Sequence, residues 1–264
     1  MAMTEELVKK IAAQLLETED QVGQMDLLTL QYPEITNEDA YKIQLAGIEK
    51  RTARGEKIVG KKIGLLNRKM QEEMSIKEPD YGIFTDLHMM YEQHDALKIS
   101  ECNKPRMEAE IAFVLKEDLA GPGVTVTDVL ATTAGIIPAI EIVDTRFNSF
   151  NLKIQDTIAD RASNGKVILG SKLTKLDNID LKLIGMACYR NGELVYTAAG
   201  AEVMGSPAQA VAWLANKLAE FGQHLKKGEI IMAGALGPLF DVKAGDVVEA
   251  HFDKLGSVIL KVVE

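Results

Sequence analysis

The sequence predicts an α+β fold in which a helical N-terminal portion lies on a mixed, β-rich core. Apolar residues recur at helical spacing in the first part of the chain, whereas short apolar runs separated by glycine turns dominate the second half. These strands do not alternate strictly with helices, which argues against a doubly wound sheet or an eight-stranded α/β barrel. We expect a single domain over residues 1–264, mainly helical in 1–56 and β-rich in 57–264.

Composition and charge narrow the class of partner. Of the 264 residues, 47% are hydrophobic and 26% are charged, and the net charge is −9 without a basic stripe, which disfavours nucleic acid and anionic membranes. No apolar run approaches the roughly 20 residues that a membrane-spanning helix needs. Cys102 and Cys188 lie far apart and outside any CxxC, and MAMTEELVKK has no signal-peptide pattern. We therefore expect a cytoplasmic protein with reduced thiols.

Two helices are expected before residue 57. The segment 4–19 (TEELVKKIAAQLLETE) has apolar residues at helical spacing, a threonine at its start and acids in its first turn. A second helix lies within 32–56, where Asn37 is the expected N-cap and Gly55 the expected stop. These helices would form the N-terminal portion.

Two long strands are expected in the middle of the chain. The segment 106–116 begins with RMEAEIAFVL, rich in β-branched and aromatic residues, and 136–147 (IIPAIEIVDTRF) is a second apolar strand. The segments around them are expected to form a strand at 57–65, a short helix at 67–74, a turn at 78–82, and a turn followed by a helix at 121–135.

The last part of the chain is expected to be β-rich, with one clear helix. An irregular piece at 156–166 precedes it. The helix spans 205–222, with Ser206 at the N-cap, Pro207 at the first position and Gly222 at its end. The expected strands lie at 166–169, 183–190, 193–198, 229–236, 246–253 and 256–263.

Glutamates occupy unusual positions in the two middle strands. Glu108 and Glu110 are two residues apart, so strand alternation places them on one face, which continues with Ala112 and Val114. This pattern alone also fits an edge strand with one solvated face. Glu141, however, stands in the apolar run IIPAIEIVD. An unpaired carboxylate there would be costly or would protonate, so we expect a buried cationic side chain or a metal ion beside it.

Carboxylates from two neighbouring strands would form an all-oxygen site that suits Mg²⁺ or Mn²⁺. Zinc is disfavoured because the four histidines show no ligand spacing. Three glutamates around a divalent ion leave a net negative charge and open positions for a chelating anionic ligand, provided that another cation balances the charge. In GKKIGL, alternation directs either Lys61 or Lys62 inward as that cation; otherwise both lysines are solvated.

Six segments occur in an order that resembles a known family. GKKIGL, EPDYG, PRMEAEIAFVL, IPAIEIVDTR, DTIADRAS and GALGPL resemble the 2-keto-4-pentenoate hydratase group of the fumarylacetoacetate hydrolase superfamily. The resemblance extends from YPEITNEDAY to GSVILKVV, nearly the whole chain. It implies a mixed β-roll with helical additions, assembled as a homo-oligomer, a pentamer or decamer.

The resemblance also implies roles for individual residues. Glu108, Glu110 and Glu141 match the ligands of a Mg²⁺ or Mn²⁺ ion, and Lys62 and Asp80 fall where the family has its proposed proton-transfer residues. The chain would then be a single catalytic domain with 57–264 as its metal-binding core. Its reaction would add water to a 2-hydroxy-2,4-dienoate and give a 4-hydroxy-2-oxo acid, in the meta-cleavage catabolism of aromatic compounds.

Two alternative functions remain open. The 4-oxalocrotonate decarboxylases resemble this chain in the metal motif, although GKKIGL, where decarboxylases tend to read GLKMGL, and AGALGP at 233–238 are closer to the hydratase form. The other alternative is a non-catalytic, metal-binding scaffold subunit that supports a paralogous hydratase or decarboxylase.

Departures from the family pattern concern the substrate more than the chemistry. Leu66 and Asn67 stand where relatives have Thr-Ser, and Arg161 replaces the asparagine of an Asp-Asn-Ala-Ser segment that here ends at Ser163. We expect these four residues to contact the substrate. The guanidinium of Arg161 would hold a second carboxylate of a longer substrate, or else face solvent.

Overall fold

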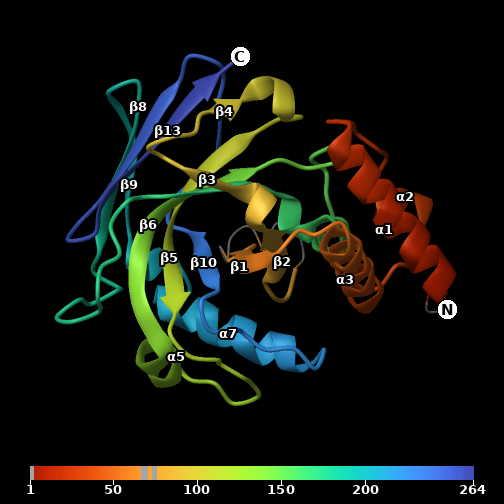
Figure 1. The fold of residues 1–264 in the computed structure, drawn as a ribbon, viewed down its shortest axis with the longest axis horizontal. Helices are drawn as coiled ribbons and strands as arrows, with labels where there is room; N and C mark the ends of the chain where they lie inside the picture. Colours follow the sequence, from red (N-terminus) through yellow and green to blue (C-terminus); the bar gives the residue numbers. More distant parts are fainter. Residues whose placement is uncertain (1–2, 67–70, 73–75) are drawn as a thin grey trace.

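The protein folds into two curled β-sheets with helices packed against them. The structure is a computed structural model and describes residues 3–66, 71–72 and 76–264. In Figure 1 the N-terminal helices lie on one side of the strands, and the C-terminal strand lies far from them. The expected α+β fold, with a helical N-terminal portion on a mixed β-rich core, is confirmed.

The larger, eight-stranded sheet contains both middle strands of the chain. Its order is β2-β1-β10-β5-β6-β7-β3, and β11 pairs with β5. The pairs β1–β10 and β3–β7 are parallel and the other pairs are antiparallel, so the sheet is mixed as expected. The strands are β1 (Ile58–Gly64), β2 (Asp80–Thr85), β3 (Met89–Tyr91), β5 (Arg106–Leu115), β6 (Thr133–Val143), β7 (Asn164–Leu169), β10 (Ile230–Ala235) and β11 (Phe240–Asp241).

The smaller sheet is built mainly from the C-terminal part of the chain. Its order is β4-β13-β12-β8-β9, with β4 parallel to β13 and the other pairs antiparallel. The strands are β4 (Leu97–Lys98), β8 (Gly185–Arg190), β9 (Glu193–Ala199), β12 (Val247–Phe252) and β13 (Gly256–Val263).

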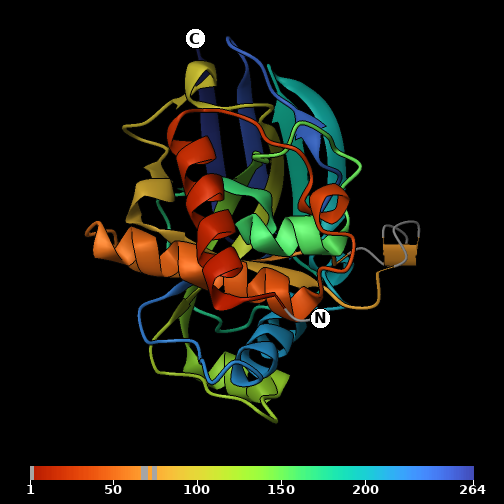
Figure 2. The same cartoon turned by 90° about the vertical axis from the view of Figure 1, so that its right-hand side faces the viewer.

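Helices pack against the large sheet, in part on its inner strands β1 and β10, and α1 packs against α3 (Figure 2). The α-helices are α1 (Glu5–Asp20), α2 (Leu28–Gln31), α3 (Asn37–Ala53), α5 (Val126–Thr132), α6 (Ile154–Ala159) and α7 (Pro207–Ala219). The 3₁₀ helices are η1 (Asp86–His88), η2 (Ile99–Glu101), η3 (Arg161–Ser163) and η4 (Gly200–Glu202). In the described part of the chain, no helix has both the length and the apolar character needed to cross a bilayer.

The ends of α3 follow capping chemistry, with one correction to the expected N-cap, whereas α7 ends at Ala219, before the expected Gly222. The N-cap of α3 is Thr36 and not Asn37, because the Thr36 hydroxyl accepts from the backbone N–H of Asp39 while Asp39 bonds back to Thr36 in a capping box. Gly55 has φ +96° directly after the C-cap, as its role as a stop requires. Ser206 and Pro207 occupy the expected positions at the start of α7.

Three expected boundaries or elements are corrected by the structure. The turn expected at 78–82 becomes strand β2 from Asp80 onward, because its backbone pairs with β1. The strand expected at 136–147 ends at Val143 and begins already at Thr133, where pairing with β5 starts. The irregular piece at 156–166 holds most of α6, all of η3 and the first residues of β7. The short helix expected at 67–74 falls largely outside the described residues.

Candidate metal and active site

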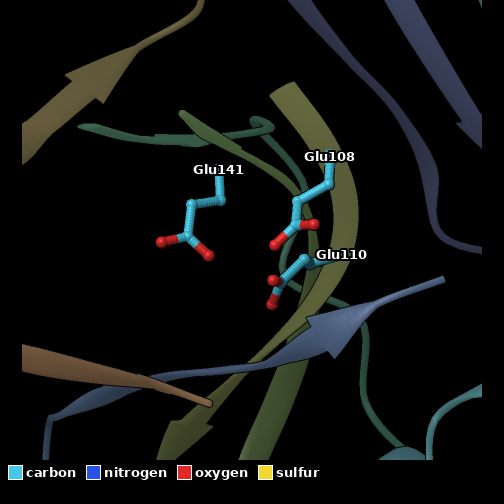
Figure 3. A group of neighbouring side chains, drawn as sticks. All are labelled: Glu108, Glu110 and Glu141. Atoms are coloured by element: carbon cyan, nitrogen blue, oxygen red, sulfur yellow. The ribbon is translucent and has the colours of Figure 1, made fainter. Parts of the chain in front are cut away.

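The pairing of β5 with β6 brings three glutamates together. In this antiparallel register Glu108 lies directly opposite Glu141, and Glu110 follows two residues along on the same face. Each residue offers a carboxylate oxygen that lies within 4.8 Å of the other two. Figure 3 shows the three carboxylates converging on one point between the strands. Sequence alternation therefore placed Glu108 and Glu110 correctly on one face.

The hydrogen bonds around these carboxylates leave oxygens free at the point of convergence. The backbone N–H of Gly234 donates to Glu110 Oε2 at 2.8 Å, and Asn164 Nδ2 donates to Glu141 Oε1 at 2.9 Å. Glu110 and Glu141 are fully buried, yet within the described residues Glu110 Oε1 and Glu141 Oε2 have no hydrogen-bond partner. Buried oxygens without a hydrogen bond are costly, and Glu141 Oε2 is offset only by the Lys62 ammonium at 3.3 Å, so this arrangement fits a hard cation bound between the carboxylates.

Electrostatics lead to the same conclusion. Burial raises the pKa of Glu108 to about 7, with Lys62 opposing the rise and Glu141 adding to it. Burial and the neighbouring charges of Glu141 and Glu108 raise the pKa of Glu110 well above its usual value. Without a bound metal ion, these two carboxyl groups therefore hold protons more readily than free glutamates do, even with Lys62 nearby. A divalent ion would remove that repulsion, and the all-oxygen donor set matches Mg²⁺ or Mn²⁺.

Lys62 is the cation that faces the cluster. Its Nζ lies 3.3 Å from Glu141 Oε2 and donates to the carbonyl oxygen of Ala162 at 3.0 Å. Burial alone would lower the pKa of Lys62, but the surrounding carboxylates, Glu141 first, raise it above the ordinary value. The ammonium is thus held protonated by the acidic groups around it.

Lys61 points the other way. Its Nζ bonds both oxygens of Glu229 at 2.7 Å, and the two lysines are only 4% and 3% exposed. Lys61 and Glu229 line a separate cavity of about 780 Å³ to which none of the three clustered glutamates contributes. The alternative of two solvated lysines is therefore wrong, and only Lys62 faces the acidic cluster.

Asp80 lies next to Lys62 across the β1–β2 ladder. It begins β2, pairs with Gly64, and is buried, and no described residue hydrogen-bonds either carboxylate oxygen. Burial raises the pKa of Asp80, Lys62 lowers it, and Glu141 raises it further. A Cβ on Gly64 would lie 2.4 Å from Asp80 Oδ1 and 3.3 Å from Lys62 Nζ. The two side chains predicted to transfer protons therefore converge over the same glycine.

This convergence makes Gly64 a sensitive position. We expect Gly64→Ala to displace the Asp80 carboxylate, because the added methyl group would overlap its oxygen. Misplacing a catalytic group by about 1 Å costs roughly a hundredfold in rate, so kcat should fall by about 10- to 100-fold. Metal affinity should stay close to that of the unmodified protein, as measured by Mn²⁺ titration. Unchanged kcat would contradict a role for this Asp80 position.

Residues 161–163 form a left-handed turn beside the cluster. Arg161, Ala162 and Ser163 have φ angles of 54°, 51° and 54°, and such conformations cost about 1–3 kcal/mol each for residues other than glycine. Arg161 is buried, and its Nη2 bonds both oxygens of Glu19 at 2.7 Å, so the alternative that it faces solvent is wrong.

The other residues expected near the substrate are placed as follows. The hydroxyl of Ser163 donates to Asp160 Oδ2 at 3.3 Å. Leu66 packs against Gly234, where a Cβ would lie 1.9 Å from Leu66 Cδ1. Asn67 lies outside the described residues. Leu66 therefore lies against the glycine whose N–H holds Glu110.

Sequence reasoning missed two residues that orient the glutamates. Asn164 and Gly234 bond Glu141 and Glu110 directly, but neither belongs to a spacing pattern with its partner. Asn164 reaches Glu141 because β7 pairs with β6, and the N–H of Gly234 reaches Glu110 because β10 pairs with β5. The only local signal was the glycine in AGALGP, where φ is +110°.

Comparisons with known proteins agree with this geometry. The sequence matches the fumarylacetoacetate (FAA) hydrolase C-terminal family over residues 60–263. It is 44% identical over 239 residues to a 2-hydroxyhexa-2,4-dienoate hydratase from Comamonas testosteroni, covering 90% of each chain. It is also 44% identical over 221 residues to a 2-hydroxypent-2,4-dienoate hydratase from Pseudomonas putida, covering 83% of this chain and 99% of the relative.

A solved structure is similar over the whole chain. The 4-oxalocrotonate decarboxylase from Pseudomonas putida G7, complexed with magnesium and adipate, superposes with a TM-score of 0.96 at 35% identity and covers 99% of both chains. The resemblance first indicated by the six sequence segments is confirmed by these matches. The chain therefore belongs to the fumarylacetoacetate hydrolase C-terminal family.

Proposed function

We propose that the protein is a metal-dependent hydratase that adds water to a 2-hydroxy-2,4-dienoate and gives a 4-hydroxy-2-oxo acid, in meta-cleavage catabolism of aromatic compounds. The observation that carries the proposal is the convergence of Glu108, Glu110 and Glu141 beside the protonated Lys62. The names of relatives that are 44% identical support the dienoate as substrate.

The metal would be Mg²⁺ or Mn²⁺, held by Glu108, Glu110 and Glu141. When bound, such an ion supplies Lewis-acid stabilisation of negative charge on a 2-oxo acid. The two buried oxygens without hydrogen bonds, Glu110 Oε1 and Glu141 Oε2, are the donors that fit it best.

Lys62 and Asp80 would move the protons. The enol hydroxyl of the dienoate loses its proton and the terminal C5 gains one, which leaves a 2-oxo-3-enoate. Water then adds at C4 while C3 gains a proton, so the atoms of one water molecule are incorporated. Asp80 is buried beside Lys62, and no described residue meets its carboxylate oxygens with a well-formed hydrogen bond, so it can accept a proton from the hydroxyl or from water. The protonated Lys62 can orient the substrate carboxylate or return a proton.

One assay tests the reaction. Freshly generated 2-hydroxypenta-2,4-dienoate is followed by the loss of its ultraviolet absorbance, with Mg²⁺, with Mn²⁺ and after chelation. Metal-dependent bleaching with incorporation of labelled water is the expected result. If the absorbance is not lost with Mg²⁺ and is not lost with Mn²⁺, the hydratase proposal is overturned.

A second candidate function rests on the structural similarity to the decarboxylase from Pseudomonas putida G7. Carbon dioxide release from 4-oxalocrotonate, without hydration of the dienoate, would identify that activity instead. Silence with both substrates, together with retained Mn²⁺ binding, would identify the scaffold alternative.

Metal binding should also stabilise the protein in a pH-dependent way. The pKa of Glu108 rises from 4.5 to about 7 on folding, so the folded metal-free protein binds more protons than the unfolded chain between these values. The stability that the proton on Glu108 contributes to the metal-free protein is therefore lost as pH rises through about 7. We expect the melting temperature after chelation to fall from about pH 5 to 8, and the increase produced by Mn²⁺ to grow over the same range. A metal-induced increase that is independent of pH would contradict this.

The wider setting extends the same proposal. The whole chain, 1–264, would act as a single catalytic domain in the cytoplasm and assemble as a homo-oligomer, a pentamer or decamer, with or without a paralogous decarboxylase or hydratase subunit. Leu66, Asn67 and Ser163 would line the substrate, with Leu66 against Gly234 the best placed of those described, whereas the Arg161 guanidinium, expected there from the sequence, is bound by Glu19. Light scattering on the purified protein measures the oligomer directly.

A further inference from the structure

The left-handed turn at 161–163 is connected to two residues of the acidic site. The carbonyl oxygen of Ala162 accepts from Lys62 Nζ at 3.0 Å. Asn164, the next residue after the turn, donates through Nδ2 to Glu141 Oε1 at 2.9 Å. A change in the turn would therefore move an ammonium and a carboxylate of the site together.

The turn is held in an unfavourable conformation without glycine. Arg161, Ala162 and Ser163 all have φ near +50°, a region that side chains with a Cβ rarely adopt, and least of all three in succession. The turn is also tightly packed, because a Cβ on Gly82 of β2 would lie 1.9 Å from the carbonyl oxygen of Arg161. Contacts outside the turn must keep it in place.

The side chain of Arg161 supplies such contacts. Its Nη2 bonds both oxygens of Glu19, in the last turn of α1, at 2.7 Å. Its Nη1 lies 3.0 Å from Nε2 of His88, a ring whose pKa is lowered to about 3 by burial and by Arg161 itself, so the ring is neutral. Because Nδ1 of this ring accepts from the backbone N–H of Thr85, the ring proton lies on Nε2, which is 3.3 Å from Glu19 Oε1. The guanidinium is thus held by Glu19, a residue outside the acidic cluster, and by the backbone carbonyl of Asn164 at 3.4 Å.

We propose that Arg161 is a positioning residue whose guanidinium, held by Glu19 of α1, maintains the left-handed turn. Through the turn it orients the ammonium of Lys62 and, through Asn164, the carboxylate of Glu141. This inference rests on the proposed function, because it acts through residues assigned there to proton transfer and metal binding. It gives helix α1 a part in the site, although none of its residues touches the glutamates that form the cluster.

The test measures the effect of Glu19→Gln in two backgrounds. Glutamine keeps the shape of the side chain but removes the charge that holds Arg161. In the unmodified protein, Glu19→Gln should weaken Mn²⁺ affinity and lower kcat, each by roughly tenfold, as loss of an outer partner of a metal ligand does. KM should change by less than about twofold, because the turn acts on the orientation of the site.

The second background is Arg161→Asn. Asparagine tolerates positive φ far better than arginine, so the turn no longer depends on Glu19. There Glu19→Gln should alter Mn²⁺ affinity and kcat by no more than about twofold, the behaviour of uncoupled sites. Arg161→Gly, which also accepts positive φ, replaces this background if Arg161→Asn does not fold.

A structural role alone would give a different pattern. Glu19 also pairs with Arg51, so Glu19→Gln should lower the melting temperature in both backgrounds. An equal loss of Mn²⁺ affinity in both backgrounds, or no loss in the unmodified protein, would overturn the inference. Asp20→Asn is the matched control, since it removes an exposed carboxylate that pairs with Arg54 at the same helix end.

The Mn²⁺ measurement separates this inference from the proposed function. If the protein binds Mn²⁺ but hydrates no dienoate, the hydratase proposal fails, while the dependence of Mn²⁺ affinity on Glu19 still tests the role of Arg161.

Discussion

Glu108→Gln should lose both divalent-ion binding and hydratase activity. The substitution keeps the side-chain shape but removes one of three converging carboxylates, and with it the charge that attracts a hard cation. Loss of an outer partner alone costs about 10- to 100-fold in metal affinity, so loss of a ligand should cost about a hundredfold or more. Because the ion contributes several kcal/mol to stabilising the transition state, kcat/KM should fall by about a thousandfold.

Although Glu108→Gln should lower metal affinity and activity, it should raise the thermal stability of the metal-free protein. Glu108 has its pKa raised to about 7 by burial and by its acidic neighbours, so its charge destabilises the metal-free fold at higher pH. Glu108→Gln should therefore raise the melting temperature of the chelated protein near pH 8 while it abolishes the increase produced by Mn²⁺. Glu193→Gln, on the exposed part of β9, is the control and should change neither. A Glu108 variant with unchanged Mn²⁺ affinity and turnover would refute the assigned metal site.

Lys62→Met should abolish activity without abolishing metal binding. Methionine matches the length of the side chain but removes an ammonium that lies 3.3 Å from Glu141 Oε2. Loss of a group that transfers protons or orients the substrate carboxylate typically costs about 10²- to 10⁴-fold, and we expect kcat to fall by that amount. Mn²⁺ affinity should be retained or should increase, because a positive charge that competes for the carboxylates is removed.

Lys62→Met should also make folding depend more on metal. Removing one partner of a buried ion pair leaves uncompensated charge, which costs roughly 3–5 kcal/mol. The chelated variant should therefore unfold at lower temperature than the chelated protein with lysine, and Mn²⁺ should restore most of the difference. Weakened Mn²⁺ affinity would mean that Lys62 supports the ligands rather than the reaction.

The neighbouring lysine provides a matched control. Lys61→Met removes an ammonium from the same strand, but one that bonds Glu229 on the opposite face. It should destabilise the protein, since Glu229 loses a buried partner, while kcat per folded molecule stays within about twofold. Equal losses of kcat in the two lysine variants would show that the activity reports only folding.

Local geometry explains why much of the fold and part of the site were predictable. The strand alternation of RMEAEIAFVL placed Glu108 and Glu110 on one face, and the apolar surroundings of Glu141 indicated that it needs a cationic partner. The helices were marked by apolar spacing and end signals such as Gly55 and Pro207. The boundaries that were wrong, at the start of β2 and at both ends of β6, were determined by pairing with another strand.

The sequence by itself determined that this chain is α+β, that two glutamates share a strand face, and which family its ordered segments resemble. Only the tertiary structure decided that Glu141 lies opposite Glu108, that Lys62 and not Lys61 faces the cluster, and that the Arg161 guanidinium is engaged by Glu19. The physical reason is the sequence distance over which each interaction acts. Side-chain direction along a strand or helix follows from backbone geometry within a few residues, whereas strand register and buried ion pairs join segments that lie tens of residues apart and are selected by packing of the whole chain.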